Sequence, residues 1–364
     1  MSYDVYADFK ASTEEDVHRL VADAGVDIAS RIRLLAGIAA QGSKDYAVSG
    51  DKKKGGGYKQ LVHAGASGAA PYAKELLQEQ LTRLNKLGLL KPSLGFASLP
   101  LGSWFLQFGF TLAKPWLSKD DDPFYVADSV NPVRKDKVFK VPVMAASSWK
   151  GLVRWTTMLV HLVKKRDDLT VEEFAGRRLD HTLLFGDEKG EGPGDAKEFA
   201  GFLDTLKAGA KNLYRQKSRE RLKLSTDADM PHYRGRLNFY PTFFDAIDLE
   251  VINPHSRKTR AGTQPIYLEC VPRGAKGTFS ILYVPFDLIG EEPARIHRKA
   301  KADLLLVAES ISAMMRTYGF SAKRTSGFGA AEDRIENGRF CTCANDWPAA
   351  RLSTLLQEAN GVQF

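Results

Sequence analysis

A glycine-rich segment with two adjacent cations, "GFSAKRTSGFGAAE" at residues 319–332, combines residue types that suit the binding of an anion. Glycine lets the backbone come close to a ligand, and main-chain N–H groups in such a loop can hold phosphate oxygens. The same segment also suits a helix end, with Gly319 after the last turn. The residues that we expect to contact phosphate are Lys323, Arg324, Thr325, Ser326, Gly327 and Gly329.

A second polar and cationic group stands at the start of an apolar helical pattern, "SSWKGLVRWTTMLVHLVKK". Ser147 and Ser148 lie where this helix would begin, and the N–H groups of a helix N-terminus attract anions. Lys150 and Arg154 are four residues apart and therefore share a face of the helix. Ser148 also has a side chain that suits a helix cap. These four residues are the second candidate phosphate contact.

The composition is that of a folded, moderately basic protein. Its 364 residues include 52 Lys+Arg and 44 Asp+Glu, and the net charge of +8 permits nucleic acid as a partner. Three cysteines do not make a disulfide framework, so we expect a reducing, cytoplasmic setting. No uninterrupted apolar segment has the length of a membrane helix, and we expect no membrane partner. Scattered histidines and the lack of a nucleotide-binding glycine motif disfavour a metal hydrolase or a nucleotide-dependent enzyme.

The apolar patterns predict the elements that must position these groups. Alternating apolar residues predict strands at 104–112 and 277–286. Spacings of three and four residues predict helices at 147–165 and 298–319, and a last short strand begins near Phe328. This order favours an α+β fold with a ferredoxin-like, RNA-recognition-type core, long insertions and a helical N-terminal extension. In such a core the first helix and the loop after the second helix can lie together, which would bring both cationic groups to one sugar–phosphate run.

The same patterns suggest a division of the chain into three parts. The apolar pattern of residues from about 13 to 90 predicts mostly helix. Near residue 100 this pattern changes to the alternation that predicts a strand. The expected parts are a helical N-terminal extension at 1–95, a core at 96–345 with insertions at about 115–145 and 186–265, and a C-terminal helical tail at 346–364.

Four sequence elements, in order over roughly residues 103–335, resemble the RAMP superfamily, the RNA-binding subunits of CRISPR effector complexes. "PVMAASSWKGLVRW" resembles its Pro–small–Ser–Ser–hydrophobic–Lys–Gly–x–x–Arg element, and "LFGDEKGEG" resembles its Leu-Phe-Gly element. The segment from "RGRLNFYPTFF" to "RGAKGTF" resembles the following strand pair, and "GFSAKRTSGFGAAE" resembles the glycine-rich loop. The chain departs from the family at Ala145 and Ala146, where a glycine is usual, and residues 1–95 match no element of it.

The resemblance implies a subunit of a type III-like complex with antiviral function. Its partners would be CRISPR RNA, complementary target RNA and the other subunits of the complex. The glycine-rich loop and the first core helix would contact the guide backbone, because base pairing supplies the sequence specificity. The stretch "LEVINPHSRKTR" resembles an element of the end-capping subunits, which bind guide RNA without cutting. Its candidate RNA-binding residues are Asn253, His255 and Arg257.

Two catalytic alternatives remain open. In the backbone-type subunits of the family, an aspartate in the loop between the first strand and the first helix cuts the paired target RNA, and Asp128 stands at the matching place. Such cleavage would use Mg²⁺, whereas guide binding alone implies no cofactor. The second alternative is a guide-RNA-processing endoribonuclease, for which His232 and Tyr233 are the candidate acid–base groups.

Overall fold

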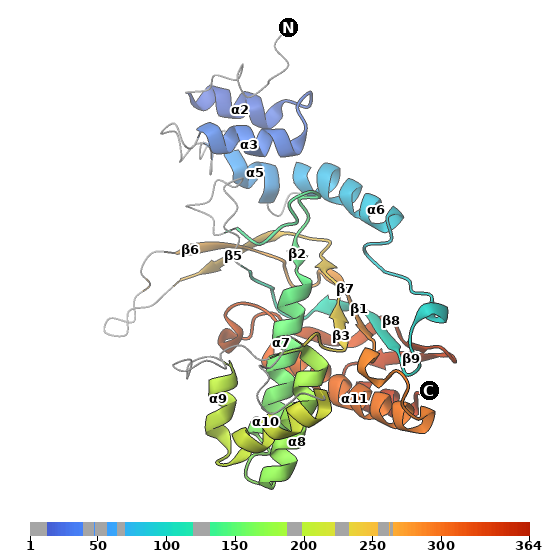
Figure 1. Cartoon of the computed structure of the whole chain (residues 1–364). Coiled ribbons are helices and arrows are strands. Elements are labelled where there is room, and N and C mark those ends of the chain that lie inside the picture. The colour runs from blue at the N-terminus through green and yellow to red at the C-terminus, as the bar shows by residue number, and fades with distance from the viewer. Residues whose placement is uncertain are drawn as a thin grey trace.

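Five antiparallel strands form the central sheet of the computed structural model (Figure 1). The structure describes residues 13–38, 47, 57–63, 70–118, 132–187, 199–222, 233–253, 262 and 265–364. The order along the sheet is β3 (Leu237–Phe239), β7 (Lys276–Tyr283), β1 (Trp104–Leu112), β8 (Ala331–Thr342) and β9 (Asp346–Arg351). All neighbours pair antiparallel, and β1 has a hydrogen-bonded partner on each side.

Alternate residues of β1 form the core beneath two helices. Successive side chains of a strand point to opposite faces, so every second residue shares a face. On this face the side chains are at most 1% exposed: Trp104, Leu106, Phe108, Phe110 and Leu112. They pack in one cluster with apolar residues of α7 (Ala146–Met158) and α11 (Pro293–Ala313). The predicted α+β class is therefore confirmed, and its two main helices cover the same sheet face.

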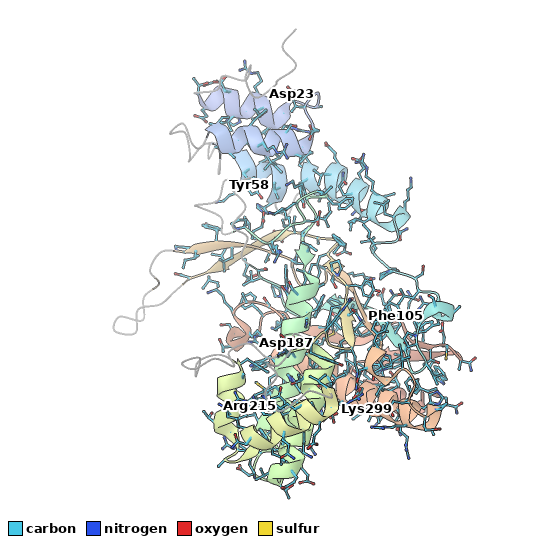
Figure 2. All side chains as sticks on the ribbon, viewed as in Figure 1. Asp23, Tyr58, Phe105, Asp187, Arg215 and Lys299 are labelled. Atoms are coloured by element: carbon cyan, nitrogen blue, oxygen red, sulfur yellow. The ribbon has the colours of Figure 1, made fainter. Side chains whose placement is uncertain are left out.

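The opposite face of β1 is covered by the segment that leads into the strand. Phe105 (Figure 2) packs there with residues of β7 and β8 and with Leu94 and Leu99, which flank the short helix η3 (Phe96–Ser98). Gln107 donates hydrogen bonds to the carbonyl of Pro92 at 3.0 Å and to the hydroxyl of Ser280 at 3.1 Å. Both faces of the central sheet are thus in contact with other parts of the chain.

The insertions between the core strands carry further helices and two small hairpins. The helices beside α7 are its extension η5 (Leu159–Val163), α8 (Val171–Phe185), α9 (Phe199–Leu206) and α10 (Ala210–Leu222). The hairpins are β2 (Val143–Met144) with β4 (Thr242–Phe243), and β5 (Asp248–Ile252) with β6 (Ile266–Cys270). The remaining elements are η6 (Phe286–Leu288), η7 (Met314–Tyr318), η8 (Arg324–Ser326) and α12 (Leu355–Gly361). In the described part of the chain, no helix is both long and apolar enough to cross a membrane.

The N-terminal part is helical, as its pattern predicts. It comprises α2 (Glu14–Ala22), α3 (Ile28–Ile38), α5 (Gly57–His63), η2 (Tyr72–Leu77) and α6 (Gln78–Lys86). Thr13 caps α2, because its hydroxyl accepts the N–H of Asp16 while the Asp16 carboxylate accepts the N–H of Thr13. Apolar residues of these helices share a buried cluster with Val141, Val143 and Phe243. The N-terminal helices are therefore attached to the rest of the molecule through an apolar interface.

A buried carboxylate strengthens this attachment. Glu269 of β6 accepts hydrogen bonds from the Tyr58 hydroxyl at 2.7 Å, from the Val133 N–H at 3.0 Å and from Lys135, and it contacts His63 Nε2 at 2.8 Å. The side chains of His63, Lys135 and Glu269 are at most 2% exposed. Burial raises the pKa of Glu269, but Lys135 and His63 outweigh it and hold that pKa at about 2. The carboxylate is ionised and links α5 to the core.

Four predictions about the elements are wrong. The predicted short last strand is the twelve-residue β8, and residues 346–351 of the predicted helical tail form β9, which pairs with it. The second core helix begins earlier, at Pro293, because proline suits the first turn of a helix. The predicted insertion at 186–265 contains β3, which pairs with β7 in the central sheet.

Candidate nucleic-acid interface

An open groove of about 520 Å³ lies between α7 and the segment that follows η7. It brings together two of the groups singled out in the sequence, because Ser148 lines one side while Lys323 and Arg324 line the other. The chain just after β1 forms the third side. The lining residues are Trp116, Leu117, Ser118, Met144, Ser148, Gly151, Leu152, Phe320, Ser321, Ala322, Lys323 and Arg324.

The N-terminus of α7 opens toward this groove without a capping side chain. The cap residue is Ala145, so the prediction that Ser148 caps the helix is wrong, and Ser148 is instead the third residue of the first turn. The first turn holds no acidic residue. The positive end of the helix dipole is consequently not neutralised by a side chain of its own turn.

Arg324 is the residue of the groove with the most specific geometry. Its guanidinium carbon lies 4.5 Å from the ring centre of Trp155, a cation–π contact that fixes the orientation of the side chain. Its Nη1 atom is buried and has no hydrogen-bond acceptor among the described residues. A buried donor without an acceptor is costly, and an arginine in this state at a groove suits a phosphate oxygen as its partner.

Two glycines of the segment are needed by the segment itself. Gly319 ends η7 with a φ of 74°, and a Cβ there would lie 2.7 Å from the carbonyl oxygen of Phe328. Gly329 has a φ of 70°, and a Cβ there would overlap Ser321. These glycines let the two ends of the loop pack against each other, so their role differs from the close approach to an anion that the sequence suggests.

The loop is also tied to the chain after β1. The Ser321 hydroxyl accepts the N–H of Leu117 at 2.7 Å, and the indole of Trp116 donates to the carbonyl of Phe320 at 3.0 Å. Sequence reasoning missed Ser321 and Trp116, since only contacts across about 200 residues give them this function. They hold one wall of the groove in place.

The polar tip of the loop faces solvent. Lys323, Thr325, Ser326 and Gly327 are exposed, and Lys323 has a left-handed backbone with a φ of 56°. Gly327 also has a positive φ, of 83°, but a Cβ there would meet no atom within 4 Å. Of the predicted phosphate contacts in this segment, Gly327 is the one glycine whose surroundings leave room for a ligand.

Lys150 and Arg154 do not line the groove. Arg154 donates to the carbonyl of Asp187 at 3.1 Å, and its guanidinium lies 4.6 Å from the ring centre of Phe199. Lys150 Nζ lies beside Gly186, 3.8 Å from the position of a Cβ on that residue. The expected convergence of both cationic groups on one site is therefore not met, because these two side chains occupy another flank of α7.

Of the remaining candidate residues, the structure describes Asn253 and Tyr233, and neither lines the groove. Asp128, His232, His255 and Arg257 lie outside the described residues. Asn253 follows β5, and its amide approaches Gly262 across the hairpin. Burial, followed by the nearby carboxylate of Asp287, raises the pKa of Tyr233 to about 12, so this phenol stays protonated near neutral pH.

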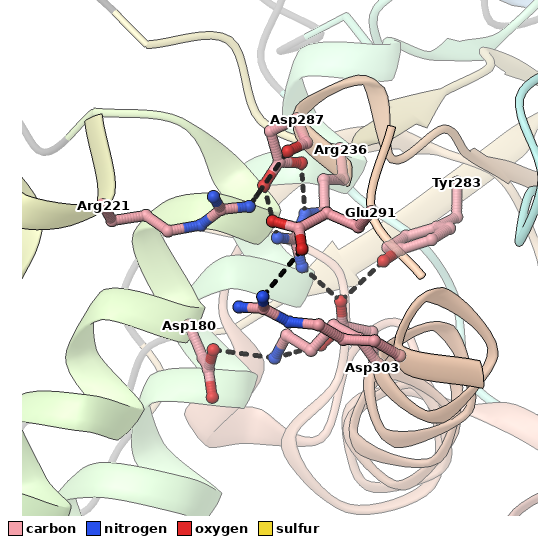
Figure 3. Close-up of polar contacts among 9 residues, drawn as sticks. Asp180, Arg221, Arg236, Tyr283, Asp287, Glu291 and Asp303 are labelled. Atoms are coloured by element: carbon pink, nitrogen blue, oxygen red, sulfur yellow. Dashed lines mark hydrogen bonds and ion pairs between the residues drawn. The ribbon is translucent and has the colours of Figure 1, made fainter. Parts of the chain in front are cut away.

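A buried ionic network holds α11 against β7 and the segment before β3 (Figure 3). Arg236 donates to both carboxylate oxygens of Asp287, at 2.8 and 2.6 Å, and to Asp303 at 2.7 Å. Tyr283 donates to Asp303 at 2.8 Å, and Lys299 pairs with Asp303 at 2.9 Å. Burial raises the pKa of Asp287, but the hydrogen bonds and charge of Arg236 leave it below its usual range. Each charge has a partner, which indicates a structural network and not a site for substrate. No group of three potential metal ligands occurs among the described residues.

Comparison with known proteins gives structural neighbours only. No family model and no curated protein matches the sequence. A chain in the cryo-EM structure of the Type III-B Cmr-beta bound to cognate target RNA is 10% identical, with a TM-score of 0.40, and the match covers 90% of this chain and 97% of that one. Cmr6 from Pyrococcus furiosus is 16% identical over 63% of this chain and 97% of its own, with a TM-score of 0.28. Csc2 from Thermofilum pendens is 12% identical over 74% and 76%, with a TM-score of 0.31.

All three TM-scores are below 0.5, and such loose superpositions do not assign an activity or a ligand to this chain.

Proposed function

We propose that this chain is a guide-RNA-binding subunit of a type III-like CRISPR effector complex. Its sequence supports this through the ordered set of RAMP-like elements, and its partners would be the guide RNA, the complementary target RNA and neighbouring subunits. The order β3-β7-β1-β8, with α7 and α11 as the helical connections, supports a ferredoxin-like core. We also propose the division into a helical N-terminal part, this core and a C-terminal segment.

The groove between α7 and the glycine-rich loop is the proposed site of the RNA backbone. The observation that carries the proposal is Arg324, which lines the groove together with Lys323 and Ser148. Its buried Nη1 lacks an acceptor among the described residues. A phosphate placed there would accept that hydrogen bond and would also meet the uncapped N-terminus of α7. Contacts of this kind hold the strand without reading its sequence, which is what guide binding requires.

The test is RNA binding by the full chain with Arg324→Ala. We expect an affinity loss of about tenfold, since a charge-assisted hydrogen bond contributes on the order of 1.5 kcal/mol. The slope of log K against log salt should fall by roughly 0.7, because one phosphate contact to a single strand is lost. Filter binding with RNAs of several sequences measures both. Arg298→Ala, which removes an exposed cation from α11, is the control and should bind like the unmodified protein. Equal affinities for both variants would contradict the proposal.

Cleavage of the paired target RNA is the second candidate function, favoured by the place of Asp128 in the loop before α7. The resemblance of the segment around Asn253 to end-capping subunits favours binding alone. We therefore expect that neither Asp128→Ala nor Asp128→Asn changes the extent to which the complex cleaves labelled complementary RNA in magnesium. Gel analysis of the RNA provides the measurement. If both substitutions abolish cutting while guide binding is retained, Asp128 is catalytic and the chain is a backbone-type subunit.

A further inference from the structure

A second cavity, of about 200 Å³, lies on the face of the central sheet that is opposite α7. Its floor includes Gly109, which alternates along β1 with the inward-facing Phe108 and Phe110. Helix α6 and the segment after it form one wall through Leu81 and Leu90. The cavity is therefore separate from the groove, and what it binds does not depend on the proposed function.

Two irregularities of the strands make this space. Between two successive register pairs, β8 has two residues where β1 has one, which is a β-bulge. Asn337 in this bulge has a left-handed backbone with a φ of 49° and lines the cavity. On the neighbouring strand, Gly109 leaves the outer face of β1 without a side chain. Bulges are frequent beside binding sites, and a glycine inside a strand often marks the close approach of another group.

The charged side chains that line the cavity balance one another. They are two lysines and two acids: Lys91, Lys276, Asp245 and Glu336. Neither a phosphate nor a metal cation would gain net attraction from such a set. The set does offer hydrogen-bond donors and acceptors together. A neutral ligand with both donors and acceptors therefore fits this lining best.

Asp245 is an acceptor that lines this cavity without a counter-ion. Its carboxylate accepts the N–H of Lys276 at 2.7 Å, while the ammonium group of Lys276 pairs with Glu336 at 2.8 Å. Among the described residues, no cation forms an ion pair with Asp245. Burial raises the pKa of Asp245, although the N–H of Lys276 lowers it in part. A partly buried carboxylate in this state gains from a ligand that donates hydrogen bonds to it.

The remaining lining is largely apolar and limits the shape of the ligand. Leu81, Leu90 and Phe243 form side walls, and Gly109 and Gly277 form part of the floor. A cavity of about 150 Å³ can hold benzene, so this one has room for a somewhat larger ring. The bases of nucleic acids are such rings, and they carry donors and acceptors on their edges.

We propose that this cavity binds a guanine base. Guanine has two adjacent donors, N1–H and the N2 amino group, and a carboxylate such as that of Asp245 can accept both at once. Its O6 atom is an acceptor, for which the ammonium groups of Lys91 and Lys276 supply donors. Adenine, cytosine and uracil lack this adjacent pair of donors. The base can come from a free nucleotide or from an RNA strand, and the experiments separate these two sources.

The first test compares guanosine monophosphate with inosine monophosphate, which lacks only the N2 amino group. Both carry the same phosphate, so phosphate contacts cancel from the comparison. In titration calorimetry with the full chain, we expect guanosine monophosphate to bind roughly tenfold more tightly, as for one correctly read base edge. Asp245→Asn should remove this difference, whereas Asp248→Asn, which changes an exposed acid at the start of β5, should keep it. Equal binding of the two nucleotides by the unmodified protein would overturn the proposal.

A second variant fills the cavity from its wall. Leu81→Trp should weaken the binding of guanosine monophosphate by roughly tenfold or more, because the larger side chain takes the place of the base. Leu87→Trp is the matched control, since Leu87 follows the last residue of α6, is 62% exposed and does not line the cavity. Melting followed by circular dichroism shows whether both variants are folded. Unchanged nucleotide binding by a folded Leu81→Trp protein would also refute the site.

RNA binding identifies the source of the base. A short polyuridine chain with one central guanosine is compared, by filter binding, with the same chain carrying inosine. If the guanosine chain binds more tightly and Asp245→Asn removes the preference, the cavity holds a base of an RNA strand. If only the mononucleotides show the preference, the ligand is a free nucleotide. A preference for guanine that persists in Asp245→Asn places the recognition elsewhere and refutes this site.

Discussion

Glu269 of β6 joins the N-terminal helix α5 to the core through one buried carboxylate. Its substitution by Gln should cost roughly 3–5 kcal/mol, because Lys135 would remain buried without a counter-ion. Urea unfolding at neutral pH measures this loss. Glu332→Gln, which changes an exposed acid of β8, is the control and should alter the midpoint little. A midpoint for Glu269→Gln close to that of the control would show that the network is not stabilising.

The same residue should make stability depend on pH. The pKa of Glu269 is lowered from 4.5 to about 2 in the folded protein. A carboxyl group with a depressed folded pKa contributes stability that is present above the unfolded pKa and is lost as the pH falls toward the folded value. The unmodified protein should therefore lose this contribution between about pH 4.5 and pH 2. In that range the urea midpoint should fall more steeply for it than for Glu269→Gln.

At the scale of elements, the loop from Gly319 to Gly329 is shaped by its own close packing. Gly329→Ala should disturb it, because the residue has a φ of 70° and a Cβ there would overlap Ser321. Since this loop forms a wall of the groove, we expect lower RNA affinity together with a lower melting temperature. Gly95→Ala is the control, with a φ of −92° and no atom within 4 Å of the added Cβ. Normal affinity in Gly329→Ala would mean that the loop geometry does not matter for binding.

At the scale of the whole molecule, the N-terminal helices belong to the same folded body as the core. If the N-terminal helices contacted only another subunit, their deletion would leave the stability of the remaining chain unchanged. Deletion of residues 1–90, however, would uncover Val141, Val143 and Phe243 and would strip Glu269 of two of its partners. We expect the truncated chain to aggregate or to melt at a lower temperature, as measured by size-exclusion chromatography and circular dichroism. A monodisperse truncated protein with unchanged melting would contradict this view.

The sequence by itself determined the local elements and the two groups that could bind phosphate. Strand β1 and helix α7 follow from the spacing of apolar residues, which is a property of short segments. Tertiary structure decided where the polar side chains of those elements point. The core fixes the rotation of α7 through Trp149 and Val153, so Ser148 faces the groove while Lys150 and Arg154 face α8 and Asp187. Glu269 likewise acquires its role only through contacts with residues more than 130 positions away, because burial and charge pairing are properties of the folded chain.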